Sequence, residues 1–272
     1  MGQSIDVGEV GGLYYFVMEY VEGKTLYDDL SKGKVFNESE ALEIILQLSN
    51  ALSHAHSLSL IHRDVKPKNI MINKDGVVKL ADMGLARETS DIKAAKHEQG
   101  KAFGTPYYIA PEQIRGLVDI DGRADIYALG ATLFHMVTGR VPFEANTPSD
   151  VMKKHLKEPL IPPDHINTAL SAGISEVVEV MMAKNRDERY KTMDEVITDL
   201  EAVYNGRPPL LARQKFNMES LEELEEGVAV DTQTVKMTLQ AEEVITKYKI
   251  AIGILIGAVF ILVLLLSMQV LW

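Results

Sequence analysis

The sequence lacks cysteine altogether among its 272 residues. Disulfide frameworks, thiolate nucleophiles and cysteine zinc sites are therefore excluded, and any metal must bind oxygen or histidine ligands. Basic residues are also in deficit, because 28 lysines and arginines stand against 39 acidic residues, for a formal net charge of -11. Nucleic-acid backbones are bound by clustered lysine and arginine, so we expect no nucleic-acid partner.

Residues 250–272 contain no charged side chain and are almost wholly apolar. As a helix they would extend about 34 Å, enough to cross a hydrocarbon core of about 30 Å. We therefore predict a single-pass membrane protein whose C-terminal helix binds the lipid bilayer. Lys247 and Lys249 directly precede this segment, which by the positive-inside tendency places the preceding domain on the cytoplasmic side. Gly253 and Gly257 form a Gly-x-x-x-Gly pair of the kind that packs two helices into a homodimer.

Composition divides the chain into three regions, with a globular domain at 1–205, a juxtamembrane linker at 206–249 and the predicted transmembrane helix at 250–272. The linker begins with a Gly-Arg-Pro-Pro sequence and contains an acidic run at 219–226. Both features are typical of exposed, weakly ordered chain.

The globular region opens with one predicted strand and continues mostly as helix. The apolar run 13–18 predicts a strand, and the glycine-rich residues 8–12 before it predict a turn. Apolar residues recur at helical spacing after Asn37 and predict a helix to about Ser57, with Asn37 and Glu40 as its capping box.

The rest of the globular region combines two short strands with further helices. The apolar runs 69–73 and 77–80 predict strands that an Asp-Gly turn joins. Predicted helices follow at 122–138, where Gly139 is the C-cap, and at 176–182 and 193–204.

Between the first long helix and the two short strands lies the segment His62-Arg63-Asp64-Val65-Lys66-Pro67-Lys68-Asn69. Transfer of a phosphoryl group needs a carboxylate near the attacking hydroxyl, a cation near the moving phosphate and oxygen ligands for magnesium. Asp64, Lys66, Asn69 and Asp82 supply that set of groups.

This segment resembles, position by position, the catalytic loop His-Arg-Asp-x-Lys-Pro-x-Asn of eukaryotic-like (Hanks-type) Ser/Thr protein kinases, in their bacterial membrane-anchored form. Asp82-Met83-Gly84 stands where the family has Asp-Phe-Gly, and Ala110-Pro111-Glu112 matches its Ala-Pro-Glu. The resemblance covers roughly residues 6 to 205. It implies a protein-kinase-like α+β fold, with a mainly helical large lobe and small β-hairpins.

The resemblance implies transfer of the ATP γ-phosphate to Ser or Thr hydroxyls of protein substrates, with ATP and Mg²⁺ as cofactors. Asp64 would be the catalytic base, and Lys66 would contact the transferred phosphate. Asn69 and Asp82 would hold magnesium. Thr105, in Gly104-Thr105-Pro106-Tyr107-Tyr108, would bond to Asp64 and Lys66 and shape the substrate site, as in the Ser/Thr branch.

The family pattern also implies an adenine site and several supporting residues. The backbone of Glu19 and Val21 would bind adenine, and Met71 would pack beneath it. The residues with structural or regulatory roles would be His62 in the catalytic loop, Arg63 as the ligand of an activating phosphate, Asp125 as the anchor of the loop backbone, and Glu112 paired with Arg189.

One part of the family pattern is absent. No glycine-rich phosphate loop, strand lysine or helix glutamate precedes Leu13, so we expect the small lobe to be nearly all missing from this sequence, and the activity of this chain alone to be severely reduced. Three explanations stay open, namely a misplaced start codon or interrupted gene, a truncated pseudokinase, and a second polypeptide that complements the chain. The alternative to an active kinase is a non-catalytic, membrane-bound docking module.

Overall fold

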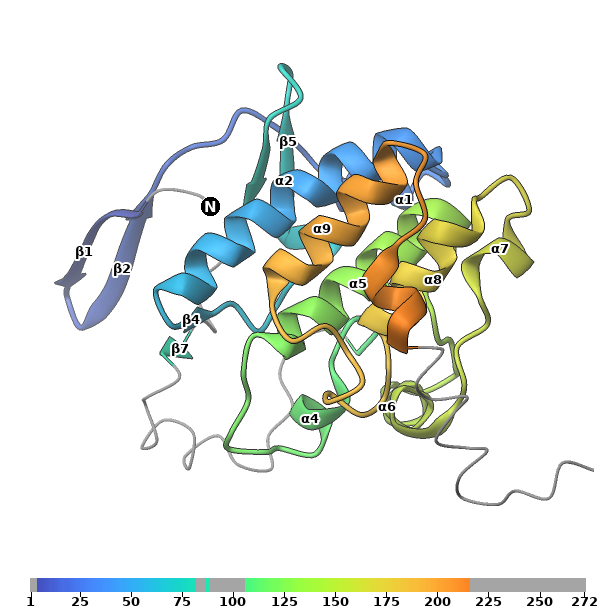
Figure 1. The fold of residues 1–272 in the computed structure, drawn as a ribbon. Helices are drawn as coiled ribbons and strands as arrows, with labels where there is room; N and C mark the ends of the chain where they lie inside the picture. The colour runs from blue at the N-terminus through green and yellow to red at the C-terminus, as the bar shows by residue number, and fades with distance from the viewer. Residues whose placement is uncertain (1–3, 82–86, 89–105, 216–272) are drawn as a thin grey trace, which may run out of the picture. The chain divides into compact units, whose positions relative to one another are not determined.

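The structure is a computed structural model that describes residues 4–81, 87–88 and 106–215, all within one compact unit of residues 1–216. It is an α+β fold in which long helices surround a shared apolar core and the strands are short and antiparallel (Figure 1). The predicted elements are largely present, with corrections at their ends.

The first two strands form an antiparallel hairpin. They are β1 (Ser4–Val10) and β2 (Leu13–Met18), which confirms the strand predicted at 13–18. The turn predicted over residues 8–12 is too long, because only Gly11 and Gly12 form it, with φ angles of 61° and 80°. Two glycines in left-handed conformations suffice to close a hairpin, so the residues before them stay paired as strand.

A three-stranded antiparallel sheet has the order β3 (Gly23–Thr25), β5 (Ile70–Asn73) and β6 (Val78–Leu80). Both strands predicted after the catalytic loop are thus confirmed, each starting one residue later. The turn between them holds Gly76 at a φ of 78°, and the Asn73 side chain accepts hydrogen bonds from two backbone amides of the turn. A separate pair joins β4 (Leu60–Ile61) to β7 (Arg87–Glu88).

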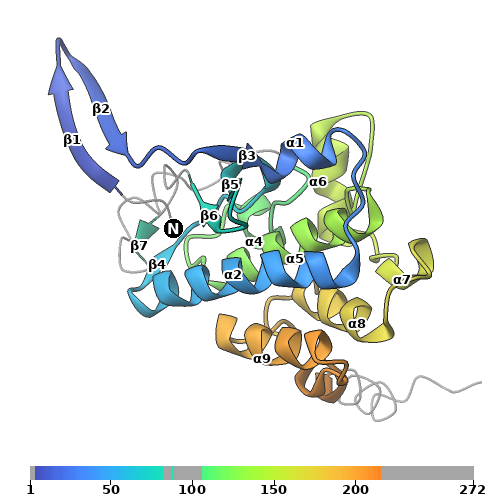
Figure 2. The same cartoon turned by 90° about the horizontal axis from the view of Figure 1, so that it is seen from above.

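Four long helices carry most of the core, namely α2 (Glu38–Ser57), α5 (Arg123–Thr138), α8 (Ala172–Met181) and α9 (Met193–Tyr204). Figures 1 and 2 show α2 lying beside both α9 and α5, and these pairs pack against each other. The helices predicted after Asn37 to Ser57 and at 193–204 are confirmed, the helix predicted at 122–138 starts one residue later, and Gly139 ends α5 with a φ of 70°.

Two helix starts differ from the sequence analysis. Asn37 caps α2 by accepting a hydrogen bond from Glu40 N at 2.9 Å, but the Glu40 carboxylate accepts from Lys34 Nζ at 2.6 Å, so the predicted capping box is only half present. Helix α8 begins at Ala172 and not near residue 176, because Ser171 caps it through a hydrogen bond from Ile174 N. A serine cap satisfies a helix amide that would otherwise lack a partner.

Several short helical segments among the described residues were not predicted from the sequence. They include α1 (Leu26–Leu30), the 3-10 turn η1 (Pro67–Asn69), α4 (Pro111–Ile114), α6 (Pro148–Lys157) and α7 (Pro163–Ile166). Most are too short to show a helical repeat of apolar residues.

The packed chain continues past Asn205, where we placed the end of the globular domain. Residues 210–215 are helical, and Ala212 is fully buried in the core. Asp199 of α9 accepts hydrogen bonds from Leu211 N at 3.2 Å and Ala212 N at 2.8 Å. The first ten residues of the predicted linker therefore belong to the packed unit.

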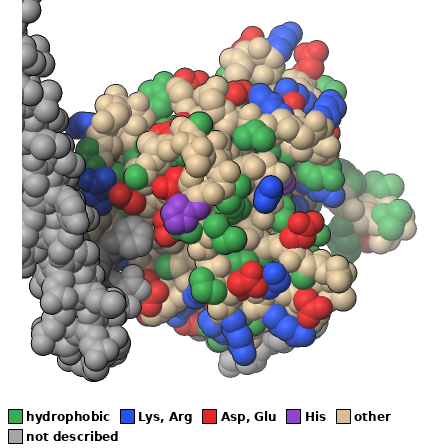
Figure 3. Space-filling view, turned by 90° about the vertical axis from the view of Figure 1, so that its right-hand side faces the viewer, with side chains coloured by type: hydrophobic (Ala, Val, Ile, Leu, Met, Phe, Trp, Pro, Cys, Tyr) green, Lys and Arg blue, Asp and Glu red, His purple; other side chains and the backbone are tan. Residues whose placement is uncertain are grey.

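Within residues 4–81, 87–88 and 106–215, no helix combines the length and the apolar character that crossing a bilayer requires. The predicted span 250–272, its glycine pair and the linker from residue 216 lie outside the described residues. Figure 3 shows one face of the molecule, where acidic and basic side chains are interspersed over the described part.

Candidate active site

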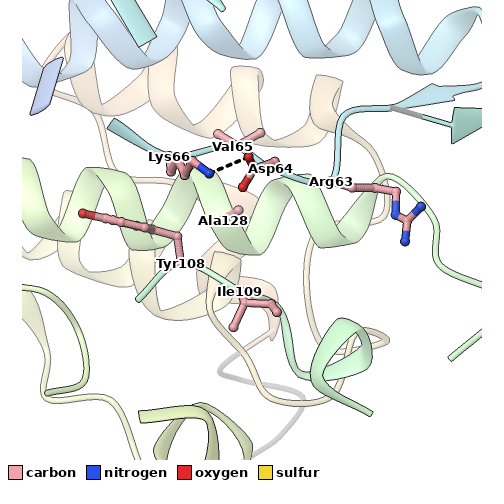
Figure 4. Close-up of a pocket in the computed structure, with 7 residues that line it drawn as sticks. All are labelled: Arg63, Asp64, Val65, Lys66, Tyr108, Ile109 and Ala128. Carbon is pink, nitrogen blue, oxygen red and sulfur yellow. Dashed lines mark hydrogen bonds and ion pairs between the residues drawn. The ribbon is translucent and has the colours of Figure 1, made fainter. Parts of the chain in front are cut away.

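The catalytic loop connects β4 to β5, and it brings three of the predicted site residues together. Lys66 Nζ lies 2.6 Å from Asp64 Oδ2, as Figure 4 shows. The amide nitrogen of Asn69 donates to the same carboxylate oxygen at 3.0 Å and to the backbone oxygen of Asp64 at 2.9 Å. These bonds hold the Asp64 carboxylate in a single orientation at the loop surface, with 12% of the side chain exposed.

Asp125, at the start of α5, accepts hydrogen bonds from the backbone of this loop. Its Oδ1 accepts from Arg63 N at 2.7 Å, and its Oδ2 accepts from His62 N at 2.9 Å and contacts His56 Nε2 at 2.8 Å. The side chain is fully buried. Burial alone would raise the pKa of Asp125, but the hydrogen bond and charge of His56, with the contributions of His62, leave that pKa below its usual value.

Arg63 has a φ of 68°, one of two positive values among the described non-glycine residues. This left-handed conformation costs roughly 1–3 kcal/mol and persists only where its surroundings enforce it. Two groups do so here, because Asp125 accepts from Arg63 N and Gln113 of α4 donates to Arg63 O at 2.8 Å. Arg63 directly precedes Asp64, so its backbone conformation determines the direction in which the Asp64 side chain projects from the loop.

His62 connects the loop to the end of β6. Its buried ring accepts a hydrogen bond from Asp64 N at Nδ1, 3.3 Å away, and its Nε2 donates to Ala81 O at 3.3 Å. Ala81 N in turn donates to Asn69 O at 2.8 Å. The residue before Asp82 is therefore tied to the catalytic loop, while Asp82 itself lies outside the described residues.

Glu112 and Arg189 form a buried ion pair, with two parallel contacts of 2.7 and 2.8 Å. The arginine is completely buried and the Glu112 side chain is 3% exposed. Arg189 also donates to the backbone oxygens of Ala183 and Arg123 and lies over the ring of Tyr127, 4.8 Å from its centroid. This network fixes α4 against the start of α5 and hence beside Asp125.

A small pocket opens where the loop meets the segment before α4 (Figure 4). Asp64 and Lys66 line one side of it, and Tyr108 and Ile109 line another. The Tyr108 hydroxyl lies 2.8 Å from Nδ1 of His135. Burial lowers the pKa of His135 to about 4, so the ring is neutral and accepts the proton of Tyr108.

The sequence analysis assigned no role to His135, because nothing in its local pattern distinguishes it from other residues of α5. The pairing becomes visible only once the fold brings residues 108 and 135 together. Thr105, which we expected to bond to Asp64 and Lys66 and to shape the substrate site, lies outside the described residues.

The three residues expected to bind adenine lie near the sheet β3-β5-β6. Glu19 and Val21 belong to the segment between β2 and β3, and Met71 of β5 pairs with Thr25 of β3. The Glu19 carboxylate contacts Lys79 Nζ of β6, which ties this segment to the sheet. All three residues are partly exposed.

Comparison with known proteins agrees with this geometry. The family model described as "Protein kinase domain" matches residues 3–199. "Serine/threonine-protein kinase PknB" of Mycobacterium tuberculosis strain H37Rv is 40% identical over 208 residues, which are 75% of this chain and 33% of that protein. "Probable serine/threonine-protein kinase CPE1738" of Clostridium perfringens is 40% identical over 199 residues, 73% of this chain and 29% of its own length.

A further relative is "Probable serine/threonine-protein kinase PknB" of Bifidobacterium longum, 37% identical over 209 residues, which are 77% of this chain and 30% of that protein. The matched part of the chain thus spans about a third of the length of these relatives. The catalytic-loop residues and the matched family model agree, and this chain belongs to the protein kinase family, in its bacterial Hanks-type Ser/Thr branch.

Proposed function

We propose that this chain is the catalytic part of a Ser/Thr protein kinase, which transfers the γ-phosphate of ATP to hydroxyl groups of protein substrates. The observation that carries the proposal is the cluster of Asp64, Lys66 and Asn69, joined by contacts of 2.6 to 3.0 Å on a loop that Asp125 anchors. Phosphoryl transfer depends on positioning and charge, and this cluster provides both.

Asp64 is the proposed catalytic base. Its carboxylate hydrogen-bonds the substrate hydroxyl, orients the oxygen toward the phosphorus and accepts the proton as the new bond forms. Lys66 neutralises charge on the transferred phosphoryl group, and its ammonium already lies 2.6 Å from Asp64. One contact thus keeps base and cation next to each other.

The donor set suits Mg²⁺, which prefers oxygen ligands in octahedral geometry. Asn69 uses its amide nitrogen for both bonds to Asp64, so neither bond consumes the amide oxygen, the atom that would hold the metal. Asp82 is the second proposed ligand. Among the described residues, no group of three or more His, Cys, Asp or Glu side chains forms a metal cluster. Bound magnesium would neutralise phosphate charge during transfer.

The adenine ring is proposed to bind the backbone of Glu19 and Val21, above Met71. The Glu19–Lys79 contact supports this assignment, because it fixes the segment beside the strand that carries Met71. Thr105 is proposed to orient Asp64 and Lys66 from the substrate side, and Arg63 is proposed to bind an activating phosphate.

The test is transfer of labelled phosphate from ATP and Mg²⁺ to Ser- and Thr-containing proteins, followed by phosphoamino-acid analysis. Asp64→Asn keeps the shape of the residue and removes the base, so we expect activity to fall about 10²- to 10⁴-fold. Asp75→Asn, in the exposed turn between β5 and β6, is the matched control and should keep full activity. Binding of ATP without transfer, equal in both proteins, would favour the non-catalytic docking module.

Covering the ATP phosphates requires a glycine-rich loop and a strand lysine, and neither motif precedes Leu13. We propose that residues outside this sequence supply them, either on the same polypeptide or on a second one. The transfer assay should therefore compare this chain with a version extended by the upstream coding sequence. Restored activity in the extended protein would support supply from the same polypeptide, and equal inactivity would leave a second polypeptide or a truncated pseudokinase, which addition of cell extract distinguishes.

The membrane location is also a proposal. It is supported by the 23 uncharged residues 250–272, which follow Lys247 and Lys249. The proposed arrangement is a kinase domain that extends to residue 215 on the cytoplasmic side, a linker from there to residue 249 and a membrane helix that pairs through Gly253 and Gly257. Carbonate extraction of membranes tests this, since deletion of 250–272 should release the protein, and Gly257→Leu should reduce self-association.

A further inference from the structure

Lys68 is a cation on the catalytic loop to which the sequence analysis gave no role. It lies in η1, next to Asn69, and its side chain is exposed. Its Nζ lies over the ring of Tyr27, 4.8 Å from the centroid. A cation–π contact of this kind restrains a long side chain that would otherwise sample many rotamers. The ammonium of Lys68 therefore has a defined place where α1 packs against η1.

That place lies beside the proposed acceptor site. Asn69, the next residue, donates to the Asp64 carboxylate. Burial, and after it the charges of the Tyr27 and Tyr107 phenols, raise the pKa of Tyr108. Tyr108 and Asp64 line the same pocket. The positive charge of Lys68 thus lies on the catalytic loop, four residues after Asp64 and next to the residue that hydrogen-bonds the Asp64 carboxylate.

The carboxylates of the neighbouring helix α1 are already engaged elsewhere. Asp28 accepts from both the amide and the hydroxyl of Thr25 at 2.8 Å. Asp29 binds Lys24 at 2.6 Å and lies 3.7 Å from Lys34. In the part of the chain that the structure describes, Lys68 has no carboxylate partner within 4.0 Å.

We propose that Lys68 determines substrate specificity by selecting proteins with an Asp or Glu side chain close to the acceptor hydroxyl. The inference rests on the proposed kinase function. The chain carries a net charge of -11, which disfavours acidic peptides overall, so a local cation would favour their binding at this place. Lys66 does not serve this purpose, because it is paired with Asp64.

The test measures binding of peptides in which alanine replaces the acceptor, so that no phosphate transfer is needed. Each peptide carries one Glu, or the isosteric Gln, at one of the three positions on either side of that alanine. Fluorescence anisotropy with the full chain in detergent, at low ionic strength, gives the ratio of the two affinities. At one or more positions we expect Glu to bind roughly two- to fivefold more tightly than Gln, as for an exposed ion pair.

Lys68→Met should remove this preference, and Lys68→Glu should reverse it in favour of Gln. Lys191→Glu is the control, because it makes the same change of charge at an exposed lysine just before α9, away from the loop, and should leave the ratio as it is. Equal affinity for Glu and Gln peptides at every position, undetectable binding of both, or a preference that survives Lys68→Glu would overturn the proposal. The Asp64→Asn transfer assay separately decides the kinase function.

Discussion

Replacing Asp125 by asparagine should damage both stability and catalysis, for reasons visible in its contacts. The carboxylate accepts from Arg63 N at Oδ1 and from His62 N at Oδ2, where His56 also binds. An asparagine amide has one acceptor oxygen and one NH₂ group. In either orientation, the NH₂ group must face a backbone N–H of the loop, so one buried donor loses its partner.

The size of the effect follows from that loss. A buried N–H without a partner costs about 1–3 kcal/mol, and a hydrogen bond to a charged group contributes about 1.5–3 kcal/mol. The neutral amide is easier to bury than the carboxylate, which offsets part of the loss. We expect the free energy of unfolding to fall by about 2–4 kcal/mol. Arg63 would also relax from its positive φ, and a shift of Asp64 by about 1 Å would lower kcat about 100-fold.

The matched control is Asp199→Asn. Asp199 is also buried, and it accepts from Leu211 N, Ala212 N and the Tyr190 hydroxyl, but it lies in α9, and these partners, like Asp199 itself, lie outside the catalytic loop. Urea unfolding followed by far-UV circular dichroism gives the stability of each variant, and phosphate transfer by the complete enzyme gives kcat. Both variants should lose stability, whereas only Asp125→Asn should lose kcat. Unchanged kcat in Asp125→Asn, or an equal loss in both, would refute the reasoning.

Two further predictions concern buried ionisable side chains, namely an ion pair and two histidines. Arg189→Met leaves Glu112 buried without its partner and should lower the free energy of unfolding by about 3–5 kcal/mol, while adding Glu112→Leu to it should recover part of that loss in the same urea assay. Burial lowers the pKa of His135 to about 4 and that of His155 to about 3, from 6.5. Only the unfolded chain binds these protons as the pH falls below about 6.5, so stability should decrease toward pH 4, and His135→Phe should flatten this dependence.

The elements that the sequence predicted well are those with a strong local pattern. Helix α2 has apolar residues at helical spacing and an asparagine cap, and the strand Leu13–Met18 is a continuous β-prone run between turn residues. The catalytic loop is also local, since Asp64, Lys66 and Asn69 lie within six residues. Their proximity in space follows directly from their spacing along the chain.

What the sequence could not predict depends on contacts between distant segments. Nothing near His135 indicates that it pairs with Tyr108, 27 residues away, and nothing near His56 indicates its bond to Asp125, 69 residues away. The cation–π contact of Lys68 is equally hidden, because it requires α1 to pack on the loop. Such pairs are set by helix packing, for which one sequence carries no direct signal.

Helix α4 shows why the Ala-Pro-Glu motif matters to a loop nearly fifty residues before it. Glu112 is held by Arg189, and the next residue, Gln113, donates to Arg63 O. The Oε1 atom of Gln113 accepts a hydrogen bond from Ala110 N, which fixes the orientation of the Gln113 amide. Loss of the buried ion pair would therefore release Gln113 and, with it, one of the two groups that hold Arg63 at positive φ. A stability defect at Arg189 should consequently appear as a fall in kcat under conditions where the protein is still folded.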